Sequence, residues 1–292
     1  MLRRAQKRRR VAPSAAEDAV ANEAEEDWDA SAALVDDTLS ALQLFATRSA
    51  AGFAATELPP IVLWHQLYTI FPNRTFIDQN VHRLRDEGAL VTFRISTGAE
   101  DVAILRTPDY VAELEKWLLL FRSQRERCGN DTASATLASQ KHDALARFIR
   151  IAPTICRLAS ISFNMLFEEL SSLHQPASAD NDDAAEGAVS SDITWLQRLG
   201  FLRESVGLVE DIFHFSVPGV GNLITAVKKT RAMLLTALKR AKYKEIAEAQ
   251  IKKHKLKHSR FDWNFHLADM EGAGIIRRTK VTSGTLVALA HK

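Results

Sequence analysis

The sequence predicts a mainly α-helical protein with small β-hairpins. Two observations lead to this fold class: three helix–glycine–hairpin junctions repeat with one spacing, and amphipathic helical segments precede each junction. The chain has 292 residues, 46% hydrophobic and 25% charged, so it can form roughly two or three domains and is too apolar for general disorder. It contains no apolar run long enough to span a membrane and no secretory signal. We expect a soluble, intracellular protein without a membrane partner.

Three glycines, Gly88, Gly200 and Gly274, mark the junctions. Apolar residues stand eleven, seven and four positions before each glycine and two positions after it. This spacing places the first three on one face of a helix, makes the glycine its left-handed C-terminal cap and starts a strand beyond it. The positions are Ile77, Val81, Leu84 and Leu90; Val189, Ile193, Leu196 and Leu202; and Trp263, Leu267, Met270 and Ile276. We expect the residue four positions before each glycine to be buried.

Each glycine is followed by two short apolar segments separated by a polar turn, which is typical of a β-hairpin. Two helical segments precede each of these repeats. They cover residues 31–46 and 61–71, 133–150 and 158–170, and 220–241 and 243–253. Three helices followed by a hairpin form the winged-helix arrangement, a helix-turn-helix variant whose hairpin is the wing. The sequence therefore predicts three tandem winged-helix domains.

The domain boundaries follow from these repeats. We expect the domains over residues 31–127, 128–217 and 218–292. The first includes a helix from Thr107-Pro108 to residue 127 that links it to the second, because this dipeptide favours a helix start. Residues 1–30 and 175–188 are poor in large apolar groups. We expect a disordered tail at the first segment and a surface loop at the second.

The net charge of +2 conceals a strong asymmetry. Residues 1–10 carry six Lys and Arg and no acid, and residues 228–292 carry sixteen Lys and Arg against five acids. The segment between them is therefore acidic. The basic decapeptide is typical of a nuclear-localisation signal, so we expect a nuclear protein; a solvated tail without a receptor is the alternative.

The third predicted domain carries the strongest charge excess. Twelve Lys and Arg lie between residues 228 and 260, against two acids. A solvated face usually mixes both signs, so the excess favours a polyanion, and no large apolar face accompanies it to favour a membrane. Base-reading Asn and Gln are scarce, which favours backbone contacts to duplex DNA with little sequence specificity. The predicted DNA-binding residues are Lys228, Arg231, Lys239, Arg240, Lys242, Lys244, Lys253, Lys255, Lys257 and, at the wing tip, Ser283.

The predicted helix over residues 220–241 separates these charges from an apolar stripe. Four residues fall in one narrow arc of its projection: Leu223, Val227, Leu234 and Leu238. The basic residues fall beside that arc. We therefore expect the stripe to pack against protein and Lys228, Arg231 and Lys239 to face solvent.

The other two domains are less suited to DNA. The third helix of the first domain balances its arginines with acids; these residues are Arg74, Arg83 and Arg85 against Asp78, Asp86 and Glu87. The second domain follows a cluster of acids around residues 180–186 and includes Asp192, which we expect to repel a duplex. We predict that these two domains dock proteins.

Three segments of the chain resemble the serine/threonine-protein kinase 19 family. They are LPPIVLWHQLYTIFPNRTFIDQNVHRLRDEGAL at 58–90, VPGVGNLITAVKKTRAMLLTALKRAKYKEI at 217–246 and HLADMEGAGIIRRTKVTSGTLVAL at 266–289. The resemblance implies a nuclear protein of tandem winged helices that binds double-stranded DNA and acts in transcription-coupled nucleotide excision repair. It implies partners at a stalled RNA polymerase II, including ubiquitin-ligase and polymerase components, and in the repair helicase complex. By position, the resemblance assigns the DNA-contacting cluster to Lys239, Arg240, Lys242 and Lys244.

The sequence argues against the activity in that family name. It has no glycine-rich loop of kinase type, no VAIK-like lysine, no HRD with a downstream Asn and no DFG, so the magnesium ions of phosphoryl transfer have no ligands. His254, His258 and His266 lack the Cys or carboxylate that would complete a zinc site. We expect a non-enzymatic adaptor without metal or cofactor, as a monomer or a homodimer formed on DNA. A serine/threonine kinase of atypical fold is the alternative.

Overall fold

The computed structural model describes residues 37–96, 100–127, 132–174, 182–205 and 211–290. It is mainly helical with small antiparallel sheets, which confirms the predicted fold class. The predicted disordered tail, residues 1–30, lies outside the described residues. Within them, no helix is both long and apolar enough to cross a membrane.

The described residues form three units of similar element order. Unit 1 contains a helix over residues 37–48, α2 (Ala50–Thr56), β1 (Val62–Leu63), the 3-10 helix η1 (Trp64–Thr69), α3 (Arg74–Asp86), β2 (Leu90–Ser96) and β3 (Glu100–Arg106). After the linking helix α4 (Thr107–Arg127), unit 2 contains α5 (Thr132–Ile155), β4 (Ile161–Ser162), α6 (Phe163–Ser171), α7 (Asp182–Leu199), β5 (Leu202–Glu204) and β6 (Ile212–Phe215). Unit 3 contains α8 (Val220–Arg240), β7 (Glu245–Ala247), α9 (Glu248–Lys252), α10 (Trp263–Gly272), β8 (Ile276–Val281) and β9 (Gly284–Leu289).

Each unit holds one three-stranded antiparallel sheet in which the last strand lies in the middle. The strand orders are β1-β3-β2, β4-β6-β5 and β7-β9-β8. The sequence predicted each hairpin but missed the first strand of each sheet. Strands of two or three residues carry no measurable alternation, so the helices predicted over 61–71, 158–170 and 243–253 were wrong at their N-terminal ends.

The three predicted glycine caps have the same geometry. The φ angles are 81° at Gly88, 87° at Gly200 and 68° at Gly274, all in the left-handed region that glycine tolerates. In each copy the glycine N–H donates to the carbonyl three residues earlier, and the next N–H donates to the carbonyl five residues earlier. The residue that accepts the second bond is Leu84, Leu196 or Met270, exposed by 2%, 0% and 0%. The predicted burial of these three positions is confirmed.

Side-chain caps fix three of the helix starts. Asn73 accepts a hydrogen bond from the Phe76 N–H at 3.2 Å and thereby begins α3. Ser162 and Asp262 cap α6 and α10 in the same way, at 3.3 and 3.0 Å from the N–H three residues on. These caps satisfy backbone donors that the first helical turn leaves unpaired.

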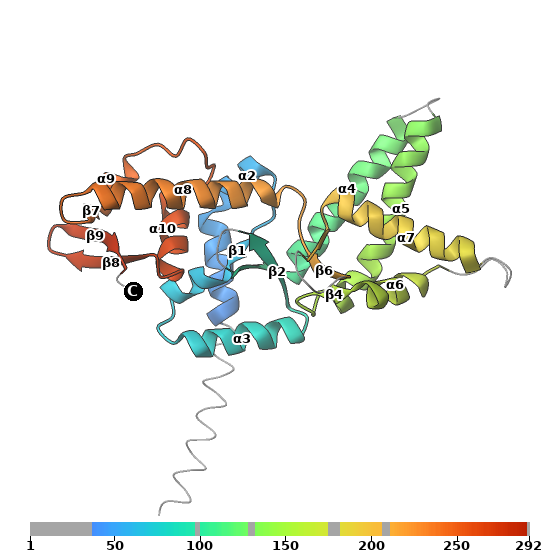
Figure 1. The fold of residues 1–292 in the computed structure, drawn as a ribbon, viewed down its shortest axis with the longest axis horizontal. Coiled ribbons are helices and arrows are strands. Elements are labelled where there is room, and N and C mark those ends of the chain that lie inside the picture. The colour runs from blue at the N-terminus through green and yellow to red at the C-terminus, as the bar shows by residue number, and fades with distance from the viewer. Residues whose placement is uncertain (1–36, 97–99, 128–131, 175–181, 206–210, 291–292) are drawn as a thin grey trace, which may run out of the picture.

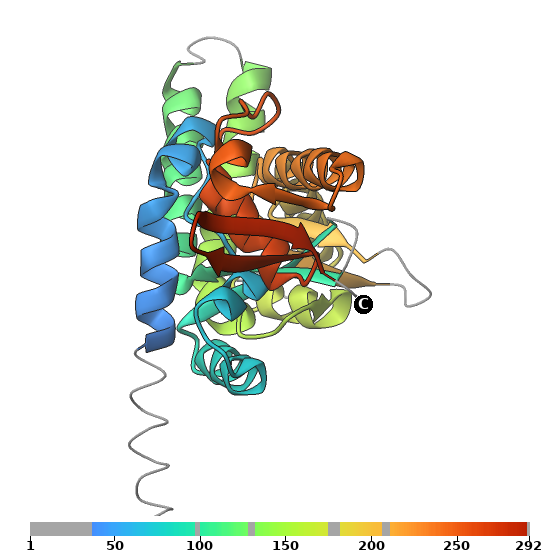
Figure 2. The same cartoon turned by 90° about the vertical axis from the view of Figure 1, so that its left-hand side faces the viewer.

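The spatial order of the units differs from their order in the chain. Unit 1 lies in the middle, with unit 2 on one side and most of unit 3 on the other, because α8, the first helix of unit 3, runs back across unit 1 (Figure 1). Seen from unit 3, the hairpin β8–β9 lies in front and the helix over residues 37–48 runs along one side (Figure 2). The apolar residues Leu223 and Val227 of α8 belong to the core shared with units 1 and 2, whereas Leu234 and Leu238 belong to the core of unit 3. The predicted stripe is thus confirmed, and it joins all three units.

Two expectations for unit 2 need correction. Residues 182–188, predicted as loop, begin α7, because alanines and acids at the start of a helix favour it. Asp192 is only 4% exposed and accepts from Arg147 Nε and Nη2 at 2.6 and 2.7 Å, so it does not present charge to a duplex. An isolated acid on an otherwise apolar helix face is usually paired with a base of a neighbouring element rather than exposed as a surface charge.

Candidate nucleic-acid interface

Four basic residues of α8 form two pairs on its exposed side. Lys228 and Lys239 are eleven positions apart, as are Lys229 and Arg240, and all four are exposed. Eleven residues make just over three whole turns, so each pair lies close to one line along the helix, about 16 Å apart. The helix thereby presents two parallel rows of positive charge to solvent.

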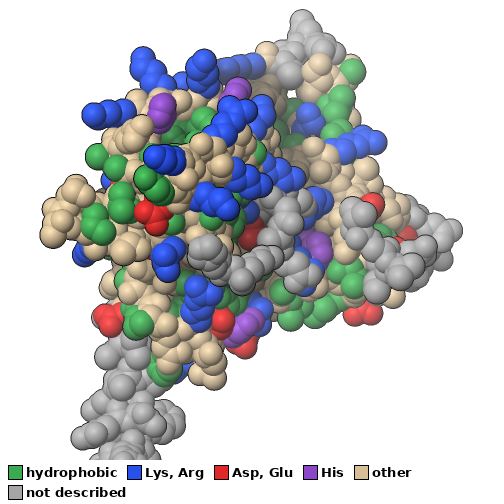
Figure 3. Space-filling view, turned by 60° about the vertical axis from the view of Figure 1, so that its left-hand side comes forward, with side chains coloured by type: hydrophobic (Ala, Val, Ile, Leu, Met, Phe, Trp, Pro, Cys, Tyr) green, Lys and Arg blue, Asp and Glu red, His purple; other side chains and the backbone are tan. Residues whose placement is uncertain are grey.

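A second group of basic residues follows the end of α8. Lys242 and Lys244 are exposed in the turn to β7, and Lys253, Lys255 and Lys257 are exposed in the segment between α9 and α10. Arg240, Lys255 and Lys257 line one groove of about 710 Å³ between α8 and this segment. The fold therefore brings both groups to one face of the molecule, where Lys and Arg side chains gather (Figure 3).

The acids of this region are largely engaged by other bases. Glu248 Oε1 lies 2.6 Å from Lys252 Nζ, and Glu271 pairs with Arg278. Among the described residues, no carboxylate lies within ion-pair distance of the basic residues predicted to bind DNA, apart from those around Arg231. The positive charge on this surface is therefore available to a ligand.

The wing of unit 3 extends the basic surface. Ser283 is exposed in the turn between β8 and β9, and Arg277 and Lys280 are exposed on β8. Sequence reasoning did not select these two bases. Three bases within four residues of the predicted hairpin, at positions 277, 278 and 280, could have indicated that this wing is basic on both faces, since successive residues of a strand point to opposite faces.

Arg231 is not part of this surface, which corrects its assignment as a DNA contact. It is 8% exposed, and its Nε and Nη2 donate to Asp269 of α10 at 2.8 and 2.6 Å, while Nη1 donates to Asp101 of β3 at 2.8 Å. His65 Nε2 of η1 lies 2.7 Å from the same Asp269. Burial alone would lower the pKa of Arg231, but the bonds and charges of both carboxylates outweigh it and hold that pKa above its ordinary value.

The third helix of unit 3, α10, faces unit 1 rather than solvent. Trp263, Phe265, Leu267 and Met270 are buried on it, and Gln66 Nε2 of η1 donates to the Phe265 carbonyl at 3.1 Å. At Gly272 the two backbones approach so closely that a Cβ there would lie 1.8 Å from the His65 carbonyl oxygen. Only glycine fits this crossing. A duplex can therefore reach α8, the α9–α10 segment and the wing of unit 3, but not α10.

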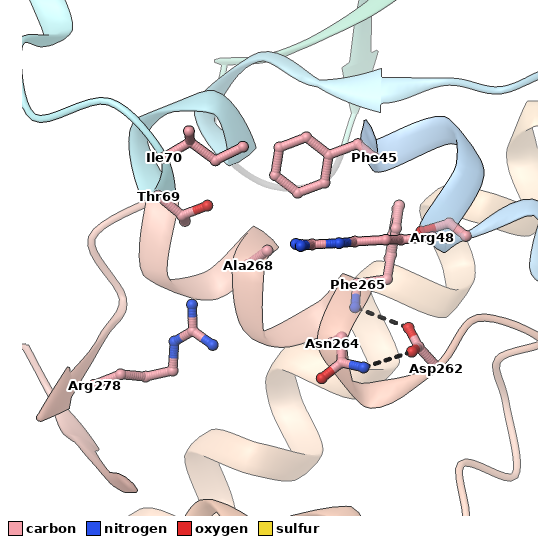
Figure 4. Close-up of a pocket in the computed structure, with 10 residues that line it drawn as sticks. Phe45, Arg48, Thr69, Ile70, Asp262, Asn264, Phe265, Ala268 and Arg278 are labelled. Atoms are coloured by element: carbon pink, nitrogen blue, oxygen red, sulfur yellow. Dashed lines mark hydrogen bonds between the residues drawn. The ribbon is translucent and has the colours of Figure 1, made fainter. Parts of the chain in front are cut away.

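A cavity of about 430 Å³ lies beside this interface, between units 1 and 3 (Figure 4). Arg48 extends across it below the ring of Phe45, and Arg278 approaches from β8. The other charged groups here are engaged: Arg278 pairs with Glu271, and Asp262 caps α10. The cavity thus offers a single cation, Arg48, without a described ion-pair partner, and we assign it no part in DNA binding.

The third helix of unit 1 keeps most of its charges paired. Arg83 Nε lies 3.0 Å from Glu87, and Arg85 Nη2 lies 3.0 Å from Asp86. Asp78 accepts from Trp64 and Tyr68. The balance of charge expected from the sequence is therefore realised as ion pairs and hydrogen bonds.

Across the described residues, no three His, Cys, Asp or Glu side chains lie close enough together to form a metal site.

Comparison with known proteins places the chain in a family. The sequence profile described as "Inactive serine-threonine protein kinase 19" matches residues 39–289. The chain belongs to this family. The resemblance found in the sequence is thereby confirmed, and the description of the family as inactive agrees with the missing kinase motifs.

Several relatives carry the name "Winged helix repair factor 1". The protein of Dictyostelium discoideum is 27% identical over an alignment of 243 positions, covering 78% of this chain and 58% of that protein. The protein of Xenopus laevis is 25% identical over 237 residues, covering 80% of this chain and 76% of that protein. The protein of Homo sapiens is 25% identical over 241 residues, covering 82% and 80%.

Proposed function

We propose that this protein is a non-enzymatic, nuclear, double-stranded DNA-binding adaptor of DNA repair, built from three tandem winged-helix domains over residues 31–127, 128–217 and 218–292. The shared strand order of the three sheets and the names of the relatives support this domain reading. The names of the relatives also support a role in repair. Transcription-coupled nucleotide excision repair at a stalled RNA polymerase II is the specific setting that we propose.

The exposed basic surface of unit 3 carries the proposal of DNA binding. Its lysines and arginines lie along a helix, in a turn, in a loop segment and on a wing, and Glu248 and Glu271 nearby pair with other bases. Charges so arranged fit the sugar-phosphate backbone, whose contacts are independent of sequence. Because α10 is buried, no recognition helix of unit 3 enters the major groove, which supports binding with little base specificity.

A titration of duplex DNA against salt tests this function. Each phosphate that the protein neutralises contributes about −0.9 to the slope of log affinity against log salt. If half of the eight exposed predicted bases each meet one phosphate, the slope is about −4. Affinity that is independent of salt, or confined to one duplex sequence, contradicts the proposal.

An atypical serine/threonine kinase remains the alternative function. A protein that binds Mg-ATP gains thermal stability as the ligand concentration exceeds the dissociation constant, so a kinase should show a higher melting temperature with Mg-ATP. We expect no such shift. Phosphorylation of a protein substrate together with a shift would establish the alternative.

The remaining parts of the proposal concern place and partners. Residues 1–10 direct the protein to the nucleus, and their deletion should leave it in the cytoplasm without lowering its melting temperature. Units 1 and 2 dock proteins of the RNA polymerase II repair complex and the repair helicase complex. We propose that the protein is a monomer, or that it forms a homodimer when it binds DNA. Molar masses from light scattering, measured with and without duplex, distinguish these two states.

A further inference from the structure

The groove between α8 and the segment that follows β7 has an apolar floor that DNA binding leaves unexplained. Met233 is 40% exposed at this floor, beside Ala237 and the half-buried Ile246. Trp263 also lines the groove, and its indole Nε1 donates to the carbonyl of His254, another lining residue, at 2.7 Å. Sugar-phosphate backbone offers no apolar group that fills such a floor.

The side of the groove that α8 forms, which includes Met233 and Ala237, can accommodate another helix. Met233, Ala237 and Arg240 stand at i, i+4 and i+7 and therefore form one stripe. Alanine at the centre of this stripe allows a second helix backbone to approach closely, while methionine adapts to different apolar side chains. Grooves with such anchors bind the apolar face of an amphipathic helix.

The rim of the groove selects the charge of its occupant. Arg240, Lys255 and Lys257 line it, together with His254, and no Asp or Glu is among its described lining residues. A basic helix would meet repulsion at this rim, whereas carboxylates on the polar face of a helix would lie beside the three cations.

We propose that this groove binds an acidic amphipathic helix of a partner protein. Apolar residues of that helix pack on Met233 and Ile246, and its carboxylates pair with Arg240, Lys255 and Lys257. The same three bases belong to the DNA surface, so the peptide and the duplex exclude each other. Only this competition depends on the proposed DNA binding; peptide binding in the groove does not. The groove would then couple release of DNA to capture of a partner.

The test uses the full chain and two labelled synthetic peptides of equal negative charge. One carries Leu, Trp and Leu at i, i+4 and i+7 among glutamates, and the other carries serine at those three positions. We expect the apolar peptide to bind about tenfold more tightly, which corresponds to about 1.4 kcal/mol. Met233→Gln should remove this preference without changing charge. Met165→Gln, at a methionine of α6 that is 42% exposed, is the matched control and should keep the preference.

Each outcome decides one of the two proposals. Equal affinity for both peptides, or an equal preference in both methionine variants, overturns the groove proposal. Displacement of bound duplex by the apolar peptide supports the competition. Peptide binding in a protein that binds no duplex retains the groove proposal and removes the proposed DNA function. Melting temperatures of both variants within about 2 °C of the unmodified protein show that folding is unchanged.

Discussion

Replacement of Arg231 by methionine tests whether this residue holds the units together or contacts DNA. Methionine keeps an unbranched, apolar stem like that of arginine, but it is shorter and provides no charge and no donor. The change removes three hydrogen bonds of 2.6 to 2.8 Å to Asp269 and Asp101. These carboxylates are 0% and 6% exposed, so bulk water does not readily replace the lost donors, and the nearby His65 does not take the place of the guanidinium.

The expected cost follows from this burial. Removing one partner of a buried ion pair costs about 3 to 5 kcal/mol, because the other charge stays buried without compensation. Burial alone would raise the pKa of Asp269, but bonds from Arg231 and His65 outweigh it and hold that pKa below its ordinary value. The pairing therefore stabilises the fold fully above the unfolded pKa of about 4, and its contribution is lost as the pH falls through the folded value. The destabilisation should be largest near neutral pH and shrink in acid.

Chemical denaturation at several pH values measures this cost, and a duplex titration follows DNA binding in parallel. Lys228→Met, at an exposed position one turn earlier on α8, is the matched control. We expect Arg231→Met to lose stability and keep most of its DNA affinity. Lys228→Met should keep its stability and bind duplex DNA more weakly. Unchanged stability with weakened DNA binding in Arg231→Met would refute the assignment of Arg231 to the buried network.

Three further predictions concern the core and its pH dependence. Leu196→Ala should cost about 2 to 5 kcal/mol in denaturation, because the side chain is fully buried; a loss below 1 kcal/mol contradicts the repeat. Gly272→Ala should prevent close packing of units 1 and 3, since its Cβ would lie 1.8 Å from the His65 carbonyl oxygen; an unchanged melting temperature would disprove this crossing. Burial lowers the pKa of His266 from 6.5 to about 4, so stability should fall by about 3 kcal/mol as the pH drops from 6.5 to 4, and His266→Gln should flatten that slope. A slope unaltered by His266→Gln would assign the acid sensitivity to another group.

The sequence predicted the parts of the fold that local physics determines. The offsets around three glycines specified helix ends, buried positions and hairpins, because apolar periodicity and left-handed caps act within a few residues. The short strands β1, β4 and β7 escaped this reasoning, since their place depends on pairing with β3, β6 and β9, far along the chain. Long-range pairing has no local pattern at a length of two or three residues.

The sequence predicted that the candidate site is basic, but it did not predict correctly which basic residues belong to it. Arg231 stands four positions after Val227 and three before Leu234, which places it on the buried stripe itself. That spacing could have indicated a buried base, but its partners come from β3 and α10, and only the fold brings them together. The spread of apolar and small residues around α10 could likewise have indicated a helix covered on most of its sides.

The most direct test of DNA binding by unit 3 reverses three of its bases. A variant with Lys239→Glu, Arg240→Glu and Lys242→Glu is titrated with duplex DNA over a range of salt, beside a control that reverses Arg74, Arg83 and Arg85 of α3. All three reversed positions of unit 3 are exposed, so its melting temperature should change little. We predict loss of binding to every duplex sequence at moderate salt for the unit 3 variant, and binding near that of the unmodified protein for the α3 variant. Full-strength binding by the unit 3 variant would contradict the account and, if the α3 variant failed, would move the DNA site to unit 1.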